Sequence, residues 1–345
     1  MSNDGHPNSR LIVRDGTRIR IALAGFGKMG YFHLLAAESL IRGEAETYYK
    51  ADLPKQIRRL GICGIHDPDI TKKAQCKGYL YYEYWQDLLA EQQPHLAIIA
   101  APTDTHFDLA IQALEAGAHT LVEKPMVTSA RALDALHACA LQHGCRLQAG
   151  HIERYNPVAI TLRTLIVDKS VDVQSYCFQR TQPLPQRISD DIITDKVVHD
   201  LDLAIYFFGP VSSARLVTGI KENGRMVEAD IQITHLSGII GTLFVSWRVA
   251  DEKLKCRSVS MICNDGERIE GDFVAKSLTV GGEPVECGVQ DWIAPVNNQL
   301  KDQLADFLAY CLNPSPDFPP PLLSPQEIRE TICLIEELKE RCQHV

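Results

Sequence analysis

The stretch Ile19-Arg-Ile-Ala-Leu-Ala-Gly-Phe-Gly-Lys-Met-Gly30 decides the fold of this 345-residue chain. An apolar, β-branched run leads into Gly25-x-Gly27-x-x-Gly30, and a helical pattern follows. Glycines spaced in this way between a strand and a helix are typical of a dinucleotide site, whereas the bare glycine pattern is weak evidence. Gly25 would allow the tight turn, Gly27 would let the backbone approach a pyrophosphate, and Gly30 would let the helix pack against the strand.

The residues between these glycines, Phe26, Lys28 and Met29, are expected to border the same ligand. The helix that follows would aim its N-terminal N–H groups and the positive end of its dipole at the phosphates. The alternative is a glycine-rich turn that binds nothing.

Apolar runs alternate with helical patterns from Ile19 to about Gly150. Strands are expected at 19–24, 60–65, 96–101, 119–122 and 146–149, and helices at 29–42, 105–116 and 129–143. Strands that alternate with helices imply a parallel sheet wound by right-handed crossovers. We therefore expect a doubly wound, Rossmann-type α/β domain over residues 19–150, preceded by a flexible arm over residues 1–18 and interrupted by an insertion at 43–59.

The pattern changes after Gly150. Alternating, strand-like segments are expected at 171–181, 214–221, 227–236, 239–249, 257–264 and 269–280, and short turns connect most of them. Successive strands without intervening helices indicate an antiparallel sheet. Helices are expected at 157–167, 195–208, 297–312 and 324–343. Residues 151–345 are therefore expected to form an α+β domain with a large open, mostly antiparallel sheet, although its final helix could return to the first domain.

The composition restricts the class of protein. The formal net charge of −9 argues against a nucleic-acid surface, because such a surface needs a basic face. No apolar run reaches the length of a membrane span, and the N-terminus lacks the apolar core of a signal peptide. The 11 cysteines form no CxxC pair, so neither a zinc knuckle nor a redox dithiol is indicated, and no metal site is expected. A cytoplasmic protein with reduced thiols is the expectation.

Asp67 follows the second expected strand. A carboxylate there would accept hydrogen bonds from adenosine ribose hydroxyls and repel a 2′-phosphate, which favours NAD over NADP. The alternative is an Asp-Pro turn, and His66 and Asp69 are weaker candidates for the same role.

The segment Ala101-Pro102-Thr103-Asp104-Thr105-His106 leaves the third expected strand. Ligands of such sheets lie outside the carboxyl ends of the strands, so Ala101, Pro102, Thr103 and His106 are expected at the cofactor. An equally weighted alternative is that Asp104 or Thr105 merely caps the next helix.

Glu123-Lys124-Pro125 lies at the carboxyl end of the next strand, and Glu123 and Lys124 are expected near the nicotinamide. The Lys124 ammonium would stabilise an alkoxide. Pro125 would restrict the backbone of Lys124. A solvated surface lysine is the alternative.

Asp195-Lys-Val-Val-His199 has the spacing that places two side chains on one helix face. Histidine suits proton abstraction near neutral pH, and a neighbouring carboxylate would orient it. The alternative is that His199 is a capping or packing residue. Arg154, Tyr155 and Asn156, at the expected domain junction, are candidate substrate contacts, with hinge chemistry and a helix cap at Asn156 as their alternative.

These segments, in this order, resemble the Gfo/Idh/MocA family of NAD(P)-dependent sugar and cyclitol oxidoreductases. The shared features are the glycine motif, Pro102-Thr…His106, Glu123-Lys124-Pro125 and Asp195-x-x-x-His199. The resemblance implies that Lys124, Asp195 and His199 are catalytic and contact the substrate, that His199 is the general acid/base, and that the C-terminal sheet joins copies into a homo-oligomer.

The resemblance implies a dehydrogenase that oxidises a ring hydroxyl of a sugar or sugar nucleotide to a ketone with NAD. The Lys124 ammonium and the His199 imidazole are then expected to converge on one carbon. A UDP-linked N-acetylhexosamine is the expected substrate. A myo-inositol or free-sugar dehydrogenase, and a non-catalytic NAD-binding regulator, are the alternatives.

Overall fold

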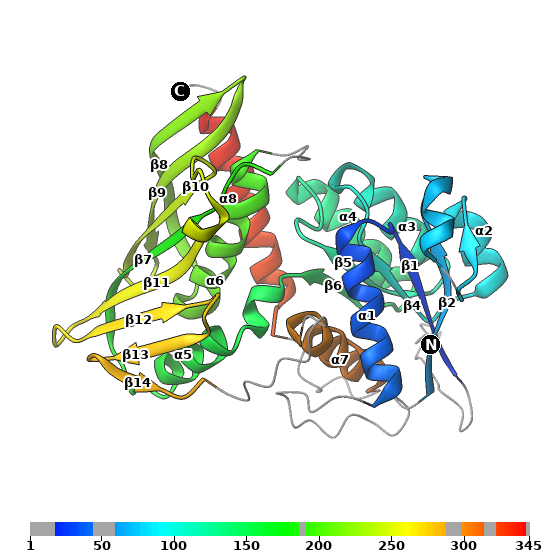
Figure 1. The fold of residues 1–345 in the computed structure, drawn as a ribbon, viewed down its shortest axis with the longest axis horizontal. Coiled ribbons are helices and arrows are strands. Elements are labelled where there is room, and N and C mark those ends of the chain that lie inside the picture. The colour runs from blue at the N-terminus through cyan, green and yellow to red at the C-terminus, as the bar shows by residue number, and fades with distance from the viewer. Residues whose placement is uncertain are drawn as a thin grey trace, which may run out of the picture. The chain divides into compact units, whose positions relative to one another are not determined.

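The computed structural model describes residues 18–43, 59–76, 78–185, 191–287, 298–313 and 322–342. The chain divides into two compact units at Gly150 (Figure 1). The second begins at His151 and includes α8 (Pro325–Cys342), while α7 (Asn298–Leu312) belongs to the first. The expected arm lies outside the described residues except for Arg18, as does all but the two ends of the insertion expected at 43–59.

The first unit contains a six-stranded parallel sheet. Its order is β3-β2-β1-β4-β5-β6, with every neighbouring pair parallel. The strands are β1 (Ile19–Ala24), β2 (Leu60–His66), β3 (Tyr81–Tyr82), β4 (Leu96–Ile99), β5 (His119–Glu123) and β6 (Leu147–Gly150). This is the strand order of a Rossmann sheet, so the expected fold class is confirmed.

Helices cover both faces of this sheet, which explains why its strands read as continuous apolar runs. They are α1 (Lys28–Arg42), α2 (Trp85–Gln92), α3 (His106–Glu115), α4 (Ala130–Gln142) and α7, with short 3₁₀ turns η2 (Ile70–Gln75) and η3 (Thr103–Thr105). Leu304 and Phe307 of α7 are buried in one core with Leu34 of α1. This packing departs from the expected division, in which all of 151–345 formed the second domain with only the final helix in question.

The second unit contains an eight-stranded sheet ordered β14-β13-β12-β11-β7-β10-β9-β8. Its strands are β7 (Val173–Thr181), β8 (Val211–Glu222), β9 (Arg225–His235), β10 (Ile240–Ser246), β11 (Cys256–Cys263), β12 (Arg268–Asp272), β13 (Ser277–Val280) and β14 (Glu283–Val285). All neighbouring pairs are antiparallel except β7 with β10, so the mostly antiparallel sheet is confirmed.

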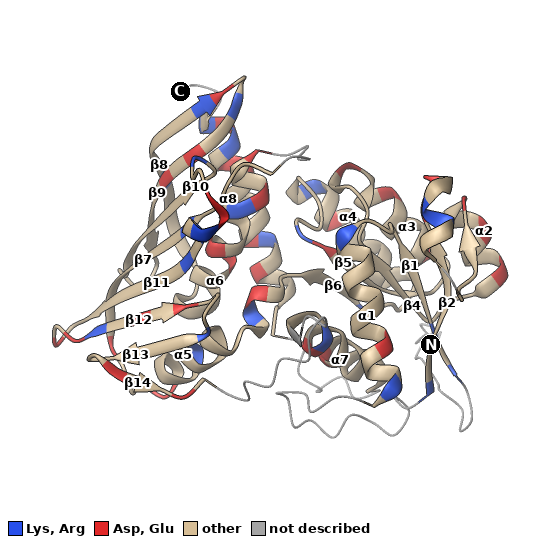
Figure 2. Ribbon diagram, in the orientation of Figure 1, with Lys and Arg blue, Asp and Glu red and all other residues tan. Residues whose placement is uncertain are grey.

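Helices α5 (Pro157–Val167), α6 (Val198–Phe208) and α8 lie on one face of this sheet (Figure 1). Single turns η4 (Ile152–Tyr155), η5 (Ile193–Val197) and η6 (Glu252–Leu254) complete the described elements. On α8, Ile328, Ile332 and Ile335 are buried at helical spacing. Figure 2 shows acidic and basic residues intermixed along the same helix, as an amphipathic surface helix requires.

Two elements differ from their sequence patterns. The single strand expected at 269–280 is a hairpin of β12 and β13, because the Asp272 carboxylate accepts the N–H groups of Val274 and Ala275 and reverses the chain. The helix expected from Asp195 begins earlier, with a π-helical turn over Ile193–Val197 that precedes α6. Elements β3, α2 and β14 had no strand or helix expectation.

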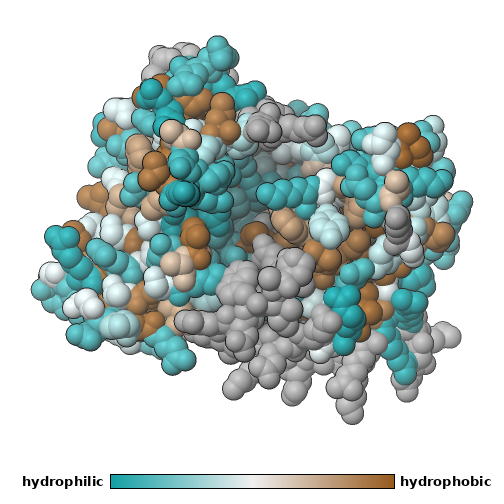
Figure 3. Space-filling view, in the orientation of Figure 1, coloured by the Kyte–Doolittle hydropathy of each residue, from teal (hydrophilic) through white to brown (hydrophobic). Residues whose placement is uncertain are grey.

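On the face of the molecule shown in Figure 3, hydrophobic and hydrophilic side chains intermix. Isolated exposed apolar residues such as Leu236 are ordinary for a folded protein. Within the described residues, no helix is both long and apolar enough to cross a membrane.

Replacement of Gly30 is expected to damage the fold. A Cβ at Gly30 would lie 2.0 Å from the Gly25 carbonyl oxygen, so Gly30→Ala must displace α1 from β1. We expect a loss of about 1–3 kcal/mol in the free energy of unfolding, measured by urea denaturation. Gly27→Ala is the matched control, because no atom lies within 4 Å of a Cβ there. Equal stability of the two variants would contradict this packing.

Candidate active site

The glycine-rich loop is built against the end of the neighbouring strand. Gly25 adopts a φ of +88°, donates its N–H to the His66 carbonyl at 2.8 Å, and lies so close to Ala101 that a Cβ would be 2.6 Å from that residue's nitrogen. Gly27 precedes α1 with no side chain capping the helix, and the space beside it is open. The loop therefore leaves room and N–H donors for a phosphate, as an NAD pyrophosphate requires.

Asp67 fixes this loop from the end of β2. Its Oδ2 accepts the Phe26 N–H at 2.7 Å and its Oδ1 accepts the Asp69 N–H at 2.9 Å. The carboxylate therefore sits beside the glycine motif, and its expected contact with the ribose stays a prediction. The hydrogen bond from the Asp69 N–H is the Asp-Pro turn that was the alternative, whereas no sequence pattern indicated the bond to the Phe26 N–H.

His106 ties two of the expected cofactor segments together. Its Nε2 lies 2.9 Å from the Ala101 carbonyl and its Nδ1 lies 3.0 Å from the Pro125 carbonyl, and the ring is 1% exposed. This geometry shows that His106 joins the β4 and β5 loops, and its expected cofactor contact stays a prediction. Ala101 and Thr103 remain partly exposed and Pro102 is exposed.

The alternative role of Asp104 and Thr105 as helix caps is not supported. Thr105 occupies the N-cap position of α3, yet its side chain does not cap the helix and instead donates to the Pro102 carbonyl at 2.8 Å.

Lys124 follows β5 and is partly exposed, in a cis peptide with Pro125. The preceding residue, Glu123, is buried, and its Oε1 lies 2.7 Å from Nε2 of His33 on α1. Burial by itself raises the pKa of Glu123, but the hydrogen bond and charge of His33, together with the Lys124 ammonium, lower it below its usual range. Glu123 is thus a buried anion behind Lys124, and its expected cofactor contact stays a prediction.

In the second unit, Asp195 and His199 lie on consecutive turns. Asp195 belongs to the π-helical turn, its side chain is 22% exposed, and it forms an ion pair with Lys196 at 3.2 Å. His199 lies in the first turn of α6. Single π turns inserted into helices occur frequently at functional sites. No sequence pattern indicated this one.

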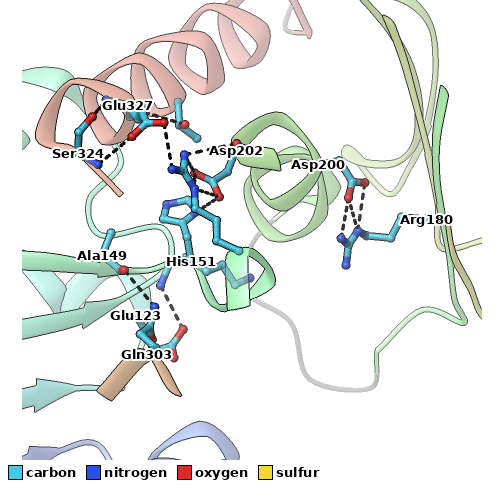
Figure 4. Close-up of polar contacts among 12 residues, drawn as sticks. Glu123, Ala149, His151, Arg180, Asp200, Asp202, Gln303, Ser324 and Glu327 are labelled. Carbon is cyan, nitrogen blue, oxygen red and sulfur yellow. Dashed lines mark hydrogen bonds and ion pairs between the residues drawn. The ribbon is translucent and has the colours of Figure 1, made fainter. Parts of the chain in front are cut away.

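The three candidate substrate contacts next to Gly150 are buried. Arg154 donates to the Asp202 carboxylate from Nε at 2.9 Å and from Nη2 at 2.8 Å, and to Glu327 of α8 at 3.0 Å (Figure 4). Asn156 caps α5 by accepting the Val158 N–H and donates to the Phe273 carbonyl. Tyr155 is 2% exposed. These contacts favour a structural role, because the polar groups of Arg154 and Asn156 are used inside the unit.

A second buried ion pair lies on the same helix, α6. Arg180 of β7 donates from Nη2 to the Asp200 carboxylate at 2.6 Å, and Arg257 of β11 donates to Glu153 at 2.6 Å (Figure 4 shows the Arg180 pair). No sequence pattern indicated that Arg180, Glu153 or Arg257 form ion pairs, since only the folded unit brings them together. Within the described ranges, no group of three or more His, Cys, Asp or Glu side chains is placed to hold a metal ion.

Asp202 is expected to support the stability of the second unit. Its burial raises its pKa, but Arg154 and His151 outweigh that effect and lower the pKa to about 2 from a usual 3.8. Asp202→Asn leaves the Arg154 charge without its main partner, so we expect a loss of about 3–5 kcal/mol in the free energy of unfolding at pH 7, measured by urea denaturation.

The same measurement at lower pH tests the electrostatic cause. Because the pKa of folded Asp202 is depressed, its contribution is complete above the unfolded pKa and falls as the pH drops toward about 2. The difference between wild type and Asp202→Asn should shrink over this range. Asp168→Asn, an exposed control, should change stability by less than about 0.5 kcal/mol at either pH. A pH-independent difference would contradict this account.

Comparison with known proteins identifies relatives that match residues of both units. Residues 19–151 match the Gfo/Idh/MocA oxidoreductase family, described as having an NAD-binding Rossmann fold. UDP-N-acetylglucosamine 3-dehydrogenase of Acidithiobacillus ferrooxidans is 35% identical over 304 residues, which are 84% of this chain and 88% of that protein. The scyllo-inositol 2-dehydrogenase (NAD(+)) of Bacillus subtilis is 26% identical over 220 residues, 61% of this chain and 58% of that protein.

Solved structures share the fold. A crystal form of the Acidithiobacillus ferrooxidans enzyme superposes with a TM-score of 0.77 at 22% identity, covering 94% of this chain and 97% of that one. An Agrobacterium radiobacter oxidoreductase in complex with NAD+, L-tartaric acid and magnesium gives a TM-score of 0.78 at 15% identity, covering 95% and 97%. Together with the 35% identity above, these comparisons show that the chain belongs to the Gfo/Idh/MocA family of oxidoreductases with an NAD-binding Rossmann fold.

Proposed function

We propose that this protein oxidises carbon 3 of a UDP-linked N-acetylhexosamine to a ketone, with NAD as the acceptor. The observation that carries the proposal is the 35% identity to a UDP-N-acetylglucosamine 3-dehydrogenase over 84% of this chain. The inositol dehydrogenase relative supports the alternative cyclitol substrate less well, because it matches a shorter part of the chain at lower identity.

The proposed chemistry uses three residues of this chain. His199 takes the proton of the substrate hydroxyl, and Asp195 orients the imidazole for that transfer. The Lys124 ammonium stabilises the negative charge that develops on the oxygen as the proton leaves. NAD, when bound, supplies the acceptor for the hydride from the ring carbon.

The first unit would hold the cofactor with backbone rather than with long side chains. Gly27 and the start of α1, with Phe26, Lys28 and Met29, would meet the pyrophosphate. The Asp67 carboxylate would disfavour a 2′-phosphate, so NAD is proposed over NADP. A cytoplasmic location and assembly into a homo-oligomer through the C-terminal sheet stay predictions that accompany this proposal.

Substrate choice is tested by following NADH absorbance with UDP-N-acetylglucosamine, myo-inositol and free glucose. We expect turnover with the sugar nucleotide alone. Lys124→Ala and His199→Ala should each lower kcat by about 100- to 10,000-fold, since each removes a group that acts on the reacting hydroxyl. NAD affinity, measured by calorimetry, should change little in either variant.

Lys253→Ala, at an exposed position of η6, is the control and should keep wild-type turnover. Wild-type rates in Lys124→Ala or His199→Ala would refute the role of that residue. Turnover of inositol but not of the sugar nucleotide would refute the substrate, and tight NAD binding without turnover of any sugar would favour a regulator.

Gly27→Ala separates the fold from cofactor binding. A methyl group at this position meets no protein atom within 4 Å, yet it occupies the space through which a pyrophosphate would approach. We expect an unchanged melting temperature and a Kd for NAD at least about tenfold higher, measured by calorimetry. Unchanged NAD affinity would show that the pyrophosphate does not bind at this loop.

A further inference from the structure

We infer that His33 is a positioning residue for Lys124 and acts through the buried carboxylate of Glu123. The inference rests on the proposed function, in which Lys124 contacts the substrate hydroxyl. His33 lies on α1, eight residues from Gly25, and belongs to none of the sequence motifs.

Hydrogen bonds connect the three residues. Nε2 of His33 lies 2.7 Å from Oε1 of Glu123, and Oε2 of Glu123 accepts the backbone N–H of Lys124 at 3.2 Å. An ionised carboxylate only accepts hydrogen bonds, so Nε2 must carry the proton. The carboxylate thus uses one oxygen to bind α1 and the other to hold the main chain of Lys124.

Packing leaves this carboxylate little freedom. Gly150 of β6 pairs with Glu123 in the sheet, and a Cβ on Gly150 would lie 2.9 Å from the Glu123 Cα and 3.1 Å from its Oε2. The backbone of Gly150 therefore packs against the carboxylate on one side, and His33 contacts it on the side of α1. A change at His33 should thus be transmitted to the start of Lys124.

The charge of Glu123 depends on the same contact. The titratable groups that act on Glu123 are His33 from α1 and Lys124 from its own strand end, and together they outweigh the burial that would raise its pKa. The neighbouring strand β6 presents Gly150, which has no charge. Loss of His33 would therefore raise the pKa of Glu123, so that the anion behind the Lys124 ammonium becomes protonated at a higher pH than in the wild type.

Packing alone does not explain a histidine at this position. His33 is 1% exposed, and its Nδ1 is buried without a hydrogen-bond partner among the described residues. An unsatisfied buried ring nitrogen costs stability, and a leucine would avoid that cost. The hydrogen bond to Glu123 is the one polar contact of this side chain that the described structure shows.

The test compares His33→Leu, which removes the donor, with His33→Gln, which keeps an N–H at a similar reach. We expect His33→Leu to lower kcat on the order of 10- to 100-fold, because a misplacement of about 1 Å at a reacting group costs about 100-fold. The acid limb of its kcat–pH profile should move to higher pH, and KM for NAD should change little. His33→Gln should recover most of kcat and return the limb toward wild type.

His119→Leu is the matched control. His119 is buried at the other end of β5, where its Nδ1 accepts the Arg146 N–H at 2.8 Å. Its loss should lower stability without moving the acid limb. If His33→Leu does not fold, Glu123→Gln carries the test, since it removes the charge and leaves one acceptor oxygen for the two donors, His33 Nε2 and the Lys124 N–H. Wild-type kcat in Glu123→Gln would overturn the inference.

Infrared difference spectra of the cofactor-free protein supply a readout independent of turnover. On acidification, the C=O band of a protonated carboxyl should appear at a higher pH in His33→Leu than in the wild type, and this band should be absent from His33→Leu/Glu123→Gln. Identical spectra and identical acid limbs for wild type and His33→Leu, with Lys124→Ala inactive, would overturn this inference alone. Full activity of Lys124→Ala would instead overturn the proposed function.

Discussion

The close approach of Gly25 to the end of β4 is the constraint on which the first unit depends. The backbone of Gly25 lies where any side chain would overlap Ala100 and Ala101, and Gly30 lies even closer to the Gly25 carbonyl. Asp67 and His106 then join this turn to the ends of β2 and β5. Four segments distant in sequence are thereby fixed at the carboxyl ends of the parallel strands. Lys124 lies at this end of the sheet and is partly exposed.

Buried charge plays the corresponding part in the second unit. Helix α6 carries His199 together with Asp200 and Asp202, which pair with Arg180 and Arg154. Removing such charges from water costs several kcal/mol per ion, and good geometry with further hydrogen bonds is needed to recover it. The two arginines supply that geometry with paired donors. These two ion pairs therefore fix the rotation of α6 about its own axis, and with it the direction in which the His199 side chain leaves the helix.

Local patterns predicted much of this structure. Apolar periodicity predicts the Rossmann sheet, the strand before Gly25 and the position of Lys124 after β5. The glycine motif predicts the turn, because this turn accommodates only glycine at Gly25 and Gly30. The apolar run of β4 likewise predicts that the loop residues Ala101, Pro102 and Thr103 follow the carboxyl end of that strand. These features depend on neighbours within a few residues.

Long-range contacts explain what the sequence did not reveal. Arg154 was expected to contact the substrate. In the structure it donates to Asp202 and Glu327, which are 48 and 173 residues away in the sequence. His106 and Glu123 were expected at the cofactor, and no local pattern indicated that they also hold loop carbonyls and His33. The return of α7 to the first unit depends on its packing against α1, which periodicity alone does not specify.

Transfer of the hydrogen on carbon 3 is the most direct test of the central claim. The protein is incubated with NAD and UDP-N-acetylglucosamine deuterated at carbon 3, and the NADH formed is analysed by mass spectrometry. The account predicts one deuterium in each NADH molecule and a slower rate than with the unlabelled substrate. NADH without deuterium would contradict oxidation at that carbon.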